Sequence, residues 1–116
     1  MSDANISLPR VFTNLLPDGW ANMTYEPFRE GVEICHLWRG GPDVALLRYA
    51  AGASVPRHRH LGLETIIVLS GSQSDDHGRY KAGSVVFNPA GSEHEVWSED
   101  GCTVLIQWER PVEFLG

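Results

Sequence analysis

The sequence has few cysteines, few basic residues and no long hydrophobic run, and each shortage excludes a class of protein. Only two of the 116 residues are cysteine, so the disulfide framework of a small secreted domain is not expected. The 9 basic residues are outnumbered by 15 acidic ones, which gives a net charge of −6 and leaves no basic stripe for nucleic acid. No apolar run has the length of a membrane span, and the N-terminus has no basic segment followed by an apolar core. We therefore predict a cytoplasmic protein that binds neither nucleic acid nor a membrane.

The two cysteines, Cys35 and Cys102, are interpreted as reduced thiols that pack as small hydrophobic residues. A redox pair or an additional metal ligand is the alternative for each. Neither residue belongs to a C-x-x-C motif, which favours the packing role.

Short β-type segments separated by turn residues make up most of the chain. With 116 residues and 42% hydrophobic content, the chain is long enough for one domain with its own core. No window keeps a helical period for three turns, and no internal repeat is visible. Many short strands with Gly, Pro and Asp turns between them predict an all-β sandwich or barrel. The predicted strands are residues 23–28, 32–38, 43–50, 55–60, 64–70, 79–82, 84–88, 93–98 and 102–109.

An irregular N-terminal arm of residues 1–22 is predicted to precede a barrel of residues 23–116. Pro9 and Pro17 interrupt the arm, and one short strand is expected near residues 8–12.

Several predicted strands are apolar on both faces, notably residues 44–47, 66–69 and 104–106. One face of a simple barrel strand meets water, so these runs indicate that the outer face of one sheet is also covered. The arm or a second subunit could provide the cover. We predict a homodimer to which the arm contributes.

Two histidines and a glutamate within residues 52–71 have the spacing of metal ligands. His58 and His60 are two apart, so on a strand both imidazoles leave from the same face. Pro56 just ahead of them excludes a continuous helix and marks the start of a strand. Glu64 follows after a bend. Two nitrogen ligands and one oxygen ligand brought together in this way indicate a site for a divalent ion.

A second segment, residues 83–98, completes a resemblance to the cupin superfamily. Residues 52–71 match the first cupin motif, G-x5-H-x-H-x3-E-x6-G, at every fixed position. Residues 83–98 match the second motif, G-x5-P-x-G-x2-H-x3-N, except that Ser98 replaces the final Asn, which is not a metal ligand in the family. The resemblance implies a single-domain jelly-roll barrel, also called a double-stranded β-helix. It also implies one divalent transition metal per chain, Zn or Fe with Ni, Mn or Cu as alternatives, bound by His58, His60, Glu64 and His94.

The neighbours of these residues predict a mostly apolar cavity beside the ion. Ile66 and Val68 share a strand face with Glu64, and Val96 shares one with His94. Glu64 could also leave the ion and serve as a catalytic base.

Three further polar side chains are given structural roles. His36 is interpreted as a partly buried, hydrogen-bonded histidine, with a position beside the cavity as the alternative. Arg57 and Arg59 flank the two histidines and are expected to point away from the site, toward surface carboxylates.

The segment Asp75-Asp76-His77-Gly78 is predicted to be a hairpin tip with a positive φ at Gly78. His77 is then exposed to solvent. A second, adventitious ion on Asp75, Asp76 and His77 is an alternative role for this turn.

The segment 74–83, together with Gly101 and Cys102, is similar to the cupin at the C-terminus of ChrR-type anti-sigma factors, and the similarity covers roughly residues 30–110. This resemblance leaves two kinds of function open. One is a metal-dependent enzyme, such as a dioxygenase acting on an oxygenated or aromatic small molecule. The other is a non-catalytic module that senses or binds a metal or ligand. In those factors a zinc-binding N-terminal domain holds the sigma factor; the residues before this barrel lack a Cys/His set, so direct sigma-factor binding is not expected.

Overall fold

The computed structural model describes residues 7–115, which are built almost entirely from β-strands. A single 3-10 turn, η2 (Gly19–Asn22), precedes the strands within this part of the chain. The predicted all-β class is therefore confirmed. Between residues 7 and 115 no helix is long and apolar enough to cross a bilayer. The strands are β1 (Glu26–Arg29), β2 (Val32–Trp38), β3 (Asp43–Tyr49), β4 (Ser54–His60), β5 (Glu64–Asp75), β6 (Gly78–Lys81), β7 (Val85–Asn88), β8 (Glu93–Trp97), β9 (Cys102–Trp108) and β10 (Val112–Phe114).

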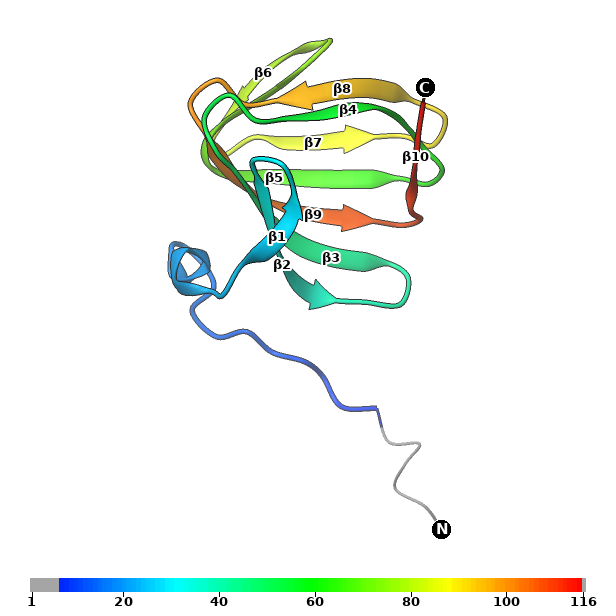
Figure 1. Ribbon diagram of the computed structural model, residues 1–116. Helices are drawn as coiled ribbons and strands as arrows, with labels where there is room; N and C mark the ends of the chain where they lie inside the picture. The colour runs from blue at the N-terminus through cyan, green and yellow to red at the C-terminus, as the bar shows by residue number, and fades with distance from the viewer. Residues whose placement is uncertain (1–6, 116) are drawn as a thin grey trace.

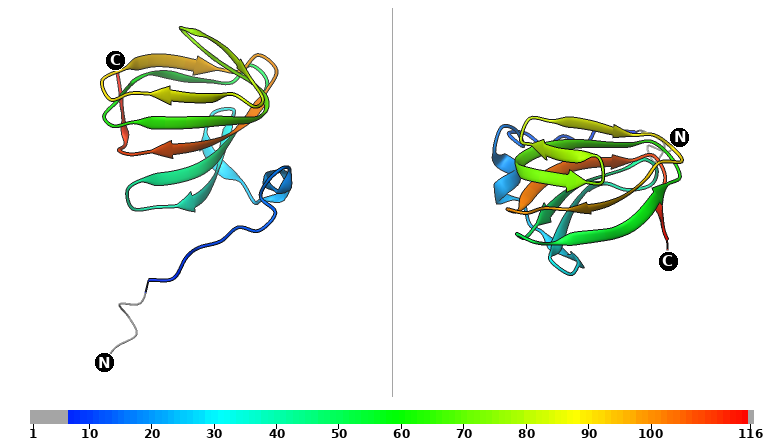
Figure 2. Two further views of the ribbon diagram at one scale, coloured as in Figure 1. Left: turned by 180° about the vertical axis from the view of Figure 1, so that it is seen from behind. Right: turned by 90° about the horizontal axis from the view of Figure 1, so that it is seen from above.

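These strands form one curled sheet that wraps around a common interior (Figure 1). The order across the sheet is β1-β2-β3-β9-β5-β8-β4-β10, and β6 and β7 both pair with β5. Strand β5 takes part in both halves of the barrel: residues 64–71 pair with β9, and residues 72–75 pair with β6. The view from above in Figure 2 shows the resulting two layers facing each other.

Glycine is required at the point where β5 passes from one half to the other. Gly71 has a φ of 67°, a conformation that L side chains rarely adopt. A Cβ at this position would also collide with the carbonyl oxygen of Gly101 on the neighbouring chain segment. The close approach of these two backbones brings β5 and β9 into register.

The barrel interior is filled by inward-facing apolar side chains that lie in rows across neighbouring strands. Ala45, Ile106 and Ile66 form one such row on β3, β9 and β5, and all three are buried. The alternation of inward and outward residues follows from the period of a strand. The core consists of Val32, Ile34, Ala45, Leu47, Tyr49, Val55, Ile66, Val68, Val96, Cys102, Val104 and Ile106.

A second apolar cluster covers the outer face of the sheet. Cys35, Leu37 and Leu46 are buried in it. The arm provides much of the cover, as the strands that are apolar on both faces predict. The residues ahead of β1 that pack on this cluster are Leu15 and Trp20 of the arm, followed by Met23 and Tyr25.

The predicted elements differ from the structure in several places, and β1 begins at Glu26 rather than at residue 23. Residues 8–12 form no strand: Pro9 lacks an N–H, and no described strand pairs with the segment. Strand β5 continues to Asp75 rather than ending at residue 70, since its pairing with β6 extends it. The short strand β10 was not predicted; it follows Pro111 and pairs with β4.

The hairpin between β5 and β6 is closed by a side chain rather than by a positive φ at Gly78, so that prediction was wrong. Asp75 Oδ1 accepts hydrogen bonds from the backbone N–H groups of His77 (2.8 Å) and Gly78 (3.2 Å). This Asx-type turn takes the place of the left-handed residue that the sequence suggested. Its consequence for the site is that Asp75 is directed inward.

Candidate metal centre

Three strands place the four candidate ligands in the barrel interior. His58 and His60 lie on the inward face of β4, and Glu64 is the first residue of β5. His94 on β8 is the cross-strand partner of His58. All four side chains are buried, and one ligand atom from each lies within 4.8 Å of all the others.

Within this cluster the nitrogen and oxygen atoms approach closely. His60 Nε2 lies 3.1 Å and His94 Nε2 3.8 Å from Glu64 Oε1. His58 Nε2 and His94 Nε2 are 3.1 Å apart. The three rings meet edge to face, with centroids 4.7–5.1 Å apart. The inner nitrogen of every imidazole therefore faces the same small space.

The outer nitrogen of each imidazole is bound to an acceptor. His58 Nδ1 donates to the carbonyl oxygen of Pro56 (2.9 Å), and His60 Nδ1 donates to that of Ser92 (3.0 Å). His94 Nδ1 lies 2.9 Å from Asp75 Oδ2, a carboxylate. Because a carbonyl or carboxylate oxygen only accepts, each Nδ1 carries the proton, and each neutral ring presents an Nε2 lone pair to the centre. This is the arrangement by which metal-binding histidines are commonly oriented.

The unmatched lone pairs at the centre fit a cation. His60 Nε2 is buried and has no hydrogen-bond partner among residues 7–115. Two Nε2 lone pairs 3.1 Å apart cannot bond to each other, and the carboxylate beside them adds negative charge. A divalent ion would accept all four donors at once. Imidazole and carboxylate donors suit Zn, Fe, Mn, Ni or Cu, so this donor set alone does not select the metal.

Glu64 is held as a carboxylate by its neighbours. Its Oε1 accepts a hydrogen bond from Asn88 Nδ2 (3.0 Å), and its Oε2 accepts one from Trp108 Nε1 (2.8 Å). Asn88 and Trp108 are its cross-strand partners on β7 and β9. These two contacts could have been predicted only from the register in which β7 and β9 pair with β5, and the spacing of the motifs does not contain that register.

Asp75 is a functional residue whose position the sequence did not predict. Besides His94, it accepts a hydrogen bond from the hydroxyl of Tyr80 (2.9 Å). Burial raises the pKa of Asp75, but the bonds from His94 and its other donors lower that pKa below its ordinary value. Burial and the bond to Asp75 raise the pKa of Tyr80 to about 12, so Tyr80 remains a donor.

The alternative of a second ion in the hairpin turn is not supported by its geometry. Asp75 points inward, Asp76 pairs with Arg57, and His77 is exposed. Within the part of the chain that the structure describes, the only cluster of three or more His, Cys, Asp or Glu side chains with metal-site geometry is that of His58, His60, Glu64 and His94.

A small cavity of about 40 Å³ adjoins the cluster. Ile66 and Val96 are part of its lining, whereas Val68 is buried in the barrel core and does not reach it. The remaining walls are mostly apolar and aromatic. The lining residues are Phe28, Leu47, Tyr49, Val55, His58, Glu64, Ile66, Gln73, His94, Val96, Ile106, Trp108, Val112 and Phe114.

The other singled-out polar side chains lie away from the cavity. His36 is partly buried and its Nε2 lies 3.8 Å from Glu26 Oε1 on the neighbouring strand β1; it is not part of the cavity lining. Arg59 pairs with Glu93 at 2.9 Å on the surface. Arg57 likewise points outward, to Asp76.

Cys35 and Cys102 are both free and buried. Cys35 belongs to the outer apolar cluster and Cys102 to the barrel core, so they lie in different layers. Burial raises the pKa of both thiols, that of Cys102 to about 11. Each is therefore kept as a neutral, packed thiol, in keeping with the packing role.

A curled antiparallel barrel with three histidines and one glutamate converging from two neighbouring motifs defines the cupin fold. Residues 19–110 match the model of the ChrR Cupin-like domain. The chain belongs to that family.

Comparison with known proteins shows two kinds of relative. The chain is 36% identical over 87 residues to the anti-sigma-E factor ChrR of Cereibacter sphaeroides. The matched region covers 72% of this chain and 41% of the relative. The chain thus spans about two fifths of the length of this relative. The structure of Rhodobacter sphaeroides SigE in complex with the anti-sigma ChrR matches with 30% identity and a TM-score of 0.69, over 75% of this chain and 50% of that one. An acetylacetone dioxygenase from Acinetobacter johnsonii matches with a TM-score of 0.78 and 19% identity, over 100% of this chain and 85% of that one. The last likeness shows the fold alone.

Proposed function

We propose that this protein is a metal-dependent cupin enzyme, a dioxygenase that acts on a small oxygenated substrate. The observation that carries the proposal is the convergence of three imidazole Nε2 atoms and the Glu64 carboxylate at the wall of an apolar cavity. A structural metal site is closed by its protein ligands, whereas this site adjoins free space that a substrate could fill. The size and lining of that space favour a small molecule with few charges.

The bound ion would act as a Lewis acid and, if it is iron, would supply the redox chemistry with O2. Asp75 fixes the ring of His94, and the two backbone carbonyls fix those of His58 and His60. The apolar walls exclude bulk water from the substrate. These residues position and shield the reacting groups.

Glu64 has a second role in this proposal, as a proton acceptor. Among residues 7–115, the one hydrogen bond to its Oε2 comes from Trp108, and Asn88 donates one to its Oε1. If Oε2 exchanges the Trp108 hydrogen bond for one from an acidic C–H or O–H of the substrate, it can take up that proton. Substrates with such a proton next to a carbonyl group are therefore favoured.

Support for this substrate class comes from the fold likeness to the acetylacetone dioxygenase, which extends over the whole length of this chain. The cavity of about 40 Å³ holds roughly three water molecules, which favours a small substrate.

The test has two stages. Elemental analysis of protein purified without chelator is expected to give about one transition metal per chain. Protein loaded with Fe(II) is then supplied with acetylacetone in an oxygen electrode, and O2 uptake is expected to require both the ion and the diketone. His94→Ala is expected to lower the rate by about 100-fold or more, and His77→Ala to leave it unchanged. Metal-loaded protein that consumes no O2 with diketones, ketones or phenols would overturn the enzymatic proposal.

The second candidate is a module that senses a metal or small ligand and responds through a protein partner. The 36% identity to an anti-sigma factor favours it. In this case metal-loaded protein binds a partner protein and shows no O2 uptake. Pull-down from the native host with metal-loaded protein and with His94→Ala distinguishes the candidates, because a sensing module loses its partner together with the ion.

A further inference from the structure

Arg29 lies next to a residue that lines the metal cavity, and one of its guanidinium nitrogens makes no hydrogen bond within residues 7–115. Arg29 is the last residue of β1, next to Phe28, which lines the cavity. The Nη1 of Arg29 is buried and has no hydrogen-bond partner among residues 7–115. A buried guanidinium N–H without an acceptor is costly, so the site is poised to receive one.

Aromatic contacts connect this guanidinium to the metal centre. Its Cζ lies 4.5 Å from the centre of the Phe114 ring, in a cation–π arrangement. The ring of Phe114 lies 5.8 Å from that of His58, its cross-strand partner on β4. Phe114 also lines the cavity. Only one aromatic ring therefore separates Arg29 from a candidate metal ligand.

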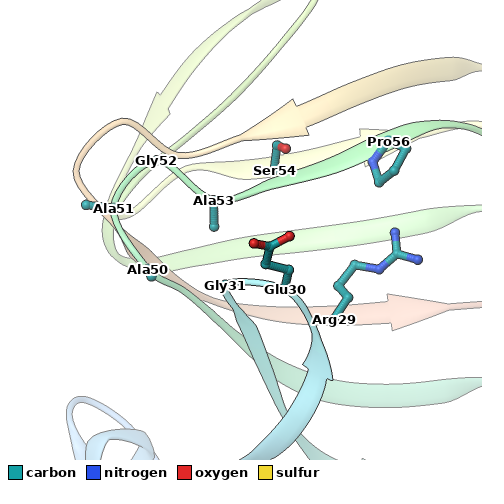
Figure 3. A pocket seen from close by; sticks show the side chains of 9 residues that line it. All are labelled: Arg29, Glu30, Gly31, Ala50, Ala51, Gly52, Ala53, Ser54 and Pro56. Atoms are coloured by element: carbon teal, nitrogen blue, oxygen red, sulfur yellow. The ribbon is translucent and has the colours of Figure 1, made fainter.

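Arg29 also lines a separate, larger groove. The groove has a volume of about 580 Å³ and lies between the end of β1 and the loop that leads into β4. Figure 3 shows the guanidinium of Arg29 extending toward Pro56, while the carboxylate of Glu30 is directed toward Ala53 and Ser54. No ion pair joins the two charged side chains among the described residues. The wall opposite them is made of small residues: Ala50, Ala51, Gly52 and Ala53.

We infer that Arg29 binds the carboxylate of a small organic acid at the mouth of the metal cavity. This inference rests on the proposed enzymatic function and narrows its substrate class to anionic molecules. The planar guanidinium matches a carboxylate in two-point geometry, and its unpaired Nη1 gives one of the two donors. The lining of the cavity contains no lysine or arginine, whereas Arg29 contacts the lining residue Phe114 and could set this preference from there.

The probe for this inference is benzoate, with uncharged benzamide as its matched control. Both are titrated by calorimetry into Zn(II)-loaded full-length protein. Wild-type protein is expected to bind benzoate in a saturable manner and more tightly than benzamide. Arg29→Gln is expected to weaken benzoate binding by about 10- to 100-fold, because a charge-assisted hydrogen bond is lost, and to leave benzamide binding unchanged. Arg29→Lys keeps the positive charge but not the two-point geometry of the guanidinium. Its benzoate affinity is expected to lie between those of the wild type and Arg29→Gln.

Arg39→Gln is the control variant, because Arg39 is an exposed arginine in the loop after β2. This variant is expected to bind benzoate like the wild type. Equal benzoate affinity in wild type and Arg29→Gln would overturn the inference. An equal loss of benzamide affinity in Arg29→Gln would also overturn it, because it would mean that Arg29 acts only by packing on Phe114. Zinc content is measured on every variant. Zinc-free wild-type protein that still binds benzoate through Arg29 would support this site independently of the ion, so that failure of the O2-uptake test and failure of this inference can be told apart.

Discussion

Asp75 Oδ2 accepts a hydrogen bond from His94 Nδ1 at 2.9 Å, although the two residues lie on different strands and Asp75 also closes a hairpin turn. One carboxylate thus determines both the geometry of a turn and the orientation of a candidate metal ligand. The bond fixes the tautomer of His94 so that its Nε2 lone pair faces the centre.

Replacing Asp75 should therefore weaken metal binding without removing a ligand. Asp75→Asn is expected to lower the affinity for Zn(II) by about 10- to 100-fold, because the neutral amide no longer holds the imidazole in its binding tautomer. Asp100→Asn alters an exposed surface carboxylate that pairs with Arg79 and serves as the control. Competitive titration against a chelating dye measures both. Equal affinities in the two variants would remove Asp75 from the site.

Exchanging single histidines separates ligands from surface residues. His94→Ala deletes one of four donors and is expected to lower metal affinity by orders of magnitude, while the far-UV spectrum and a cooperative melt persist. His77→Ala is expected to do neither, because His77 lies exposed at the hairpin tip. Calorimetric titration with Zn(II) or Fe(II) tests both variants. Retention of the metal by His94→Ala together with its loss from His77→Ala would refute the assignment of these residues.

Removal of the metal should leave the fold intact. The core and the outer cluster are built from apolar side chains that do not depend on an ion, unlike a zinc finger. Chelator-treated protein is expected to keep its β spectrum and to melt cooperatively at a lower temperature, by the ligand-linkage effect. Readdition of Zn(II) is expected to restore the melting temperature. Loss of the β spectrum on chelation would show instead that the ion is needed for folding.

The barrel and its four candidate ligands could be located in the sequence because their residues have fixed local spacing. His58, His60 and Glu64 lie within one strand-turn-strand unit, and the periods of the flanking strands decide which way they point. The strands themselves followed from turn residues and β-type runs, and most boundaries agree within a few residues.

What the sequence did not predict depends on pairing between distant strands. Asn88 and Trp108 reach Glu64 only because β7 and β9 flank β5 in a particular register. The inward turn of Asp75 depends on the continuation of β5 into its pairing with β6. Register arises from the whole core, so no short motif contains it.

The bend in β5 gives a prediction about stability. Gly71→Ala combines a positive φ with a collision against the Gly101 carbonyl, so it is expected to destabilise the fold strongly. Gly83→Ala has a similar φ, 95°, but nothing within 4 Å of the added carbon, so backbone strain of about 1–3 kcal/mol is its whole cost. Urea unfolding of the two variants measures the difference. Equal losses would mean that the collision relaxes without cost.

Assembly is the last property that the structure allows us to predict. The arm covers the outer face over β2, β3 and β9, but the same face continues over β5 to the edge strand β7. There Val85 is 53% and Phe87 63% exposed, and the arm itself exposes Leu8 (78%) and Val11 (70%). Large apolar side chains that remain exposed in this way favour a contact with another protein, and in a homodimer the same surface of each subunit can form both sides of that contact.

We therefore expect the protein to form a homodimer through this face. Phe87→Glu places a charge in the contact and is expected to shift the protein toward monomer while leaving metal binding intact, since Phe87 points away from the cavity. Glu95→Gln alters an exposed residue on β8, remote from the patch, and is expected to leave the dimer unchanged. Light scattering at micromolar concentration measures the mass of each. A wild-type mass equal to the single chain, 12.9 kDa, would show that the exposed face has no second copy as its partner.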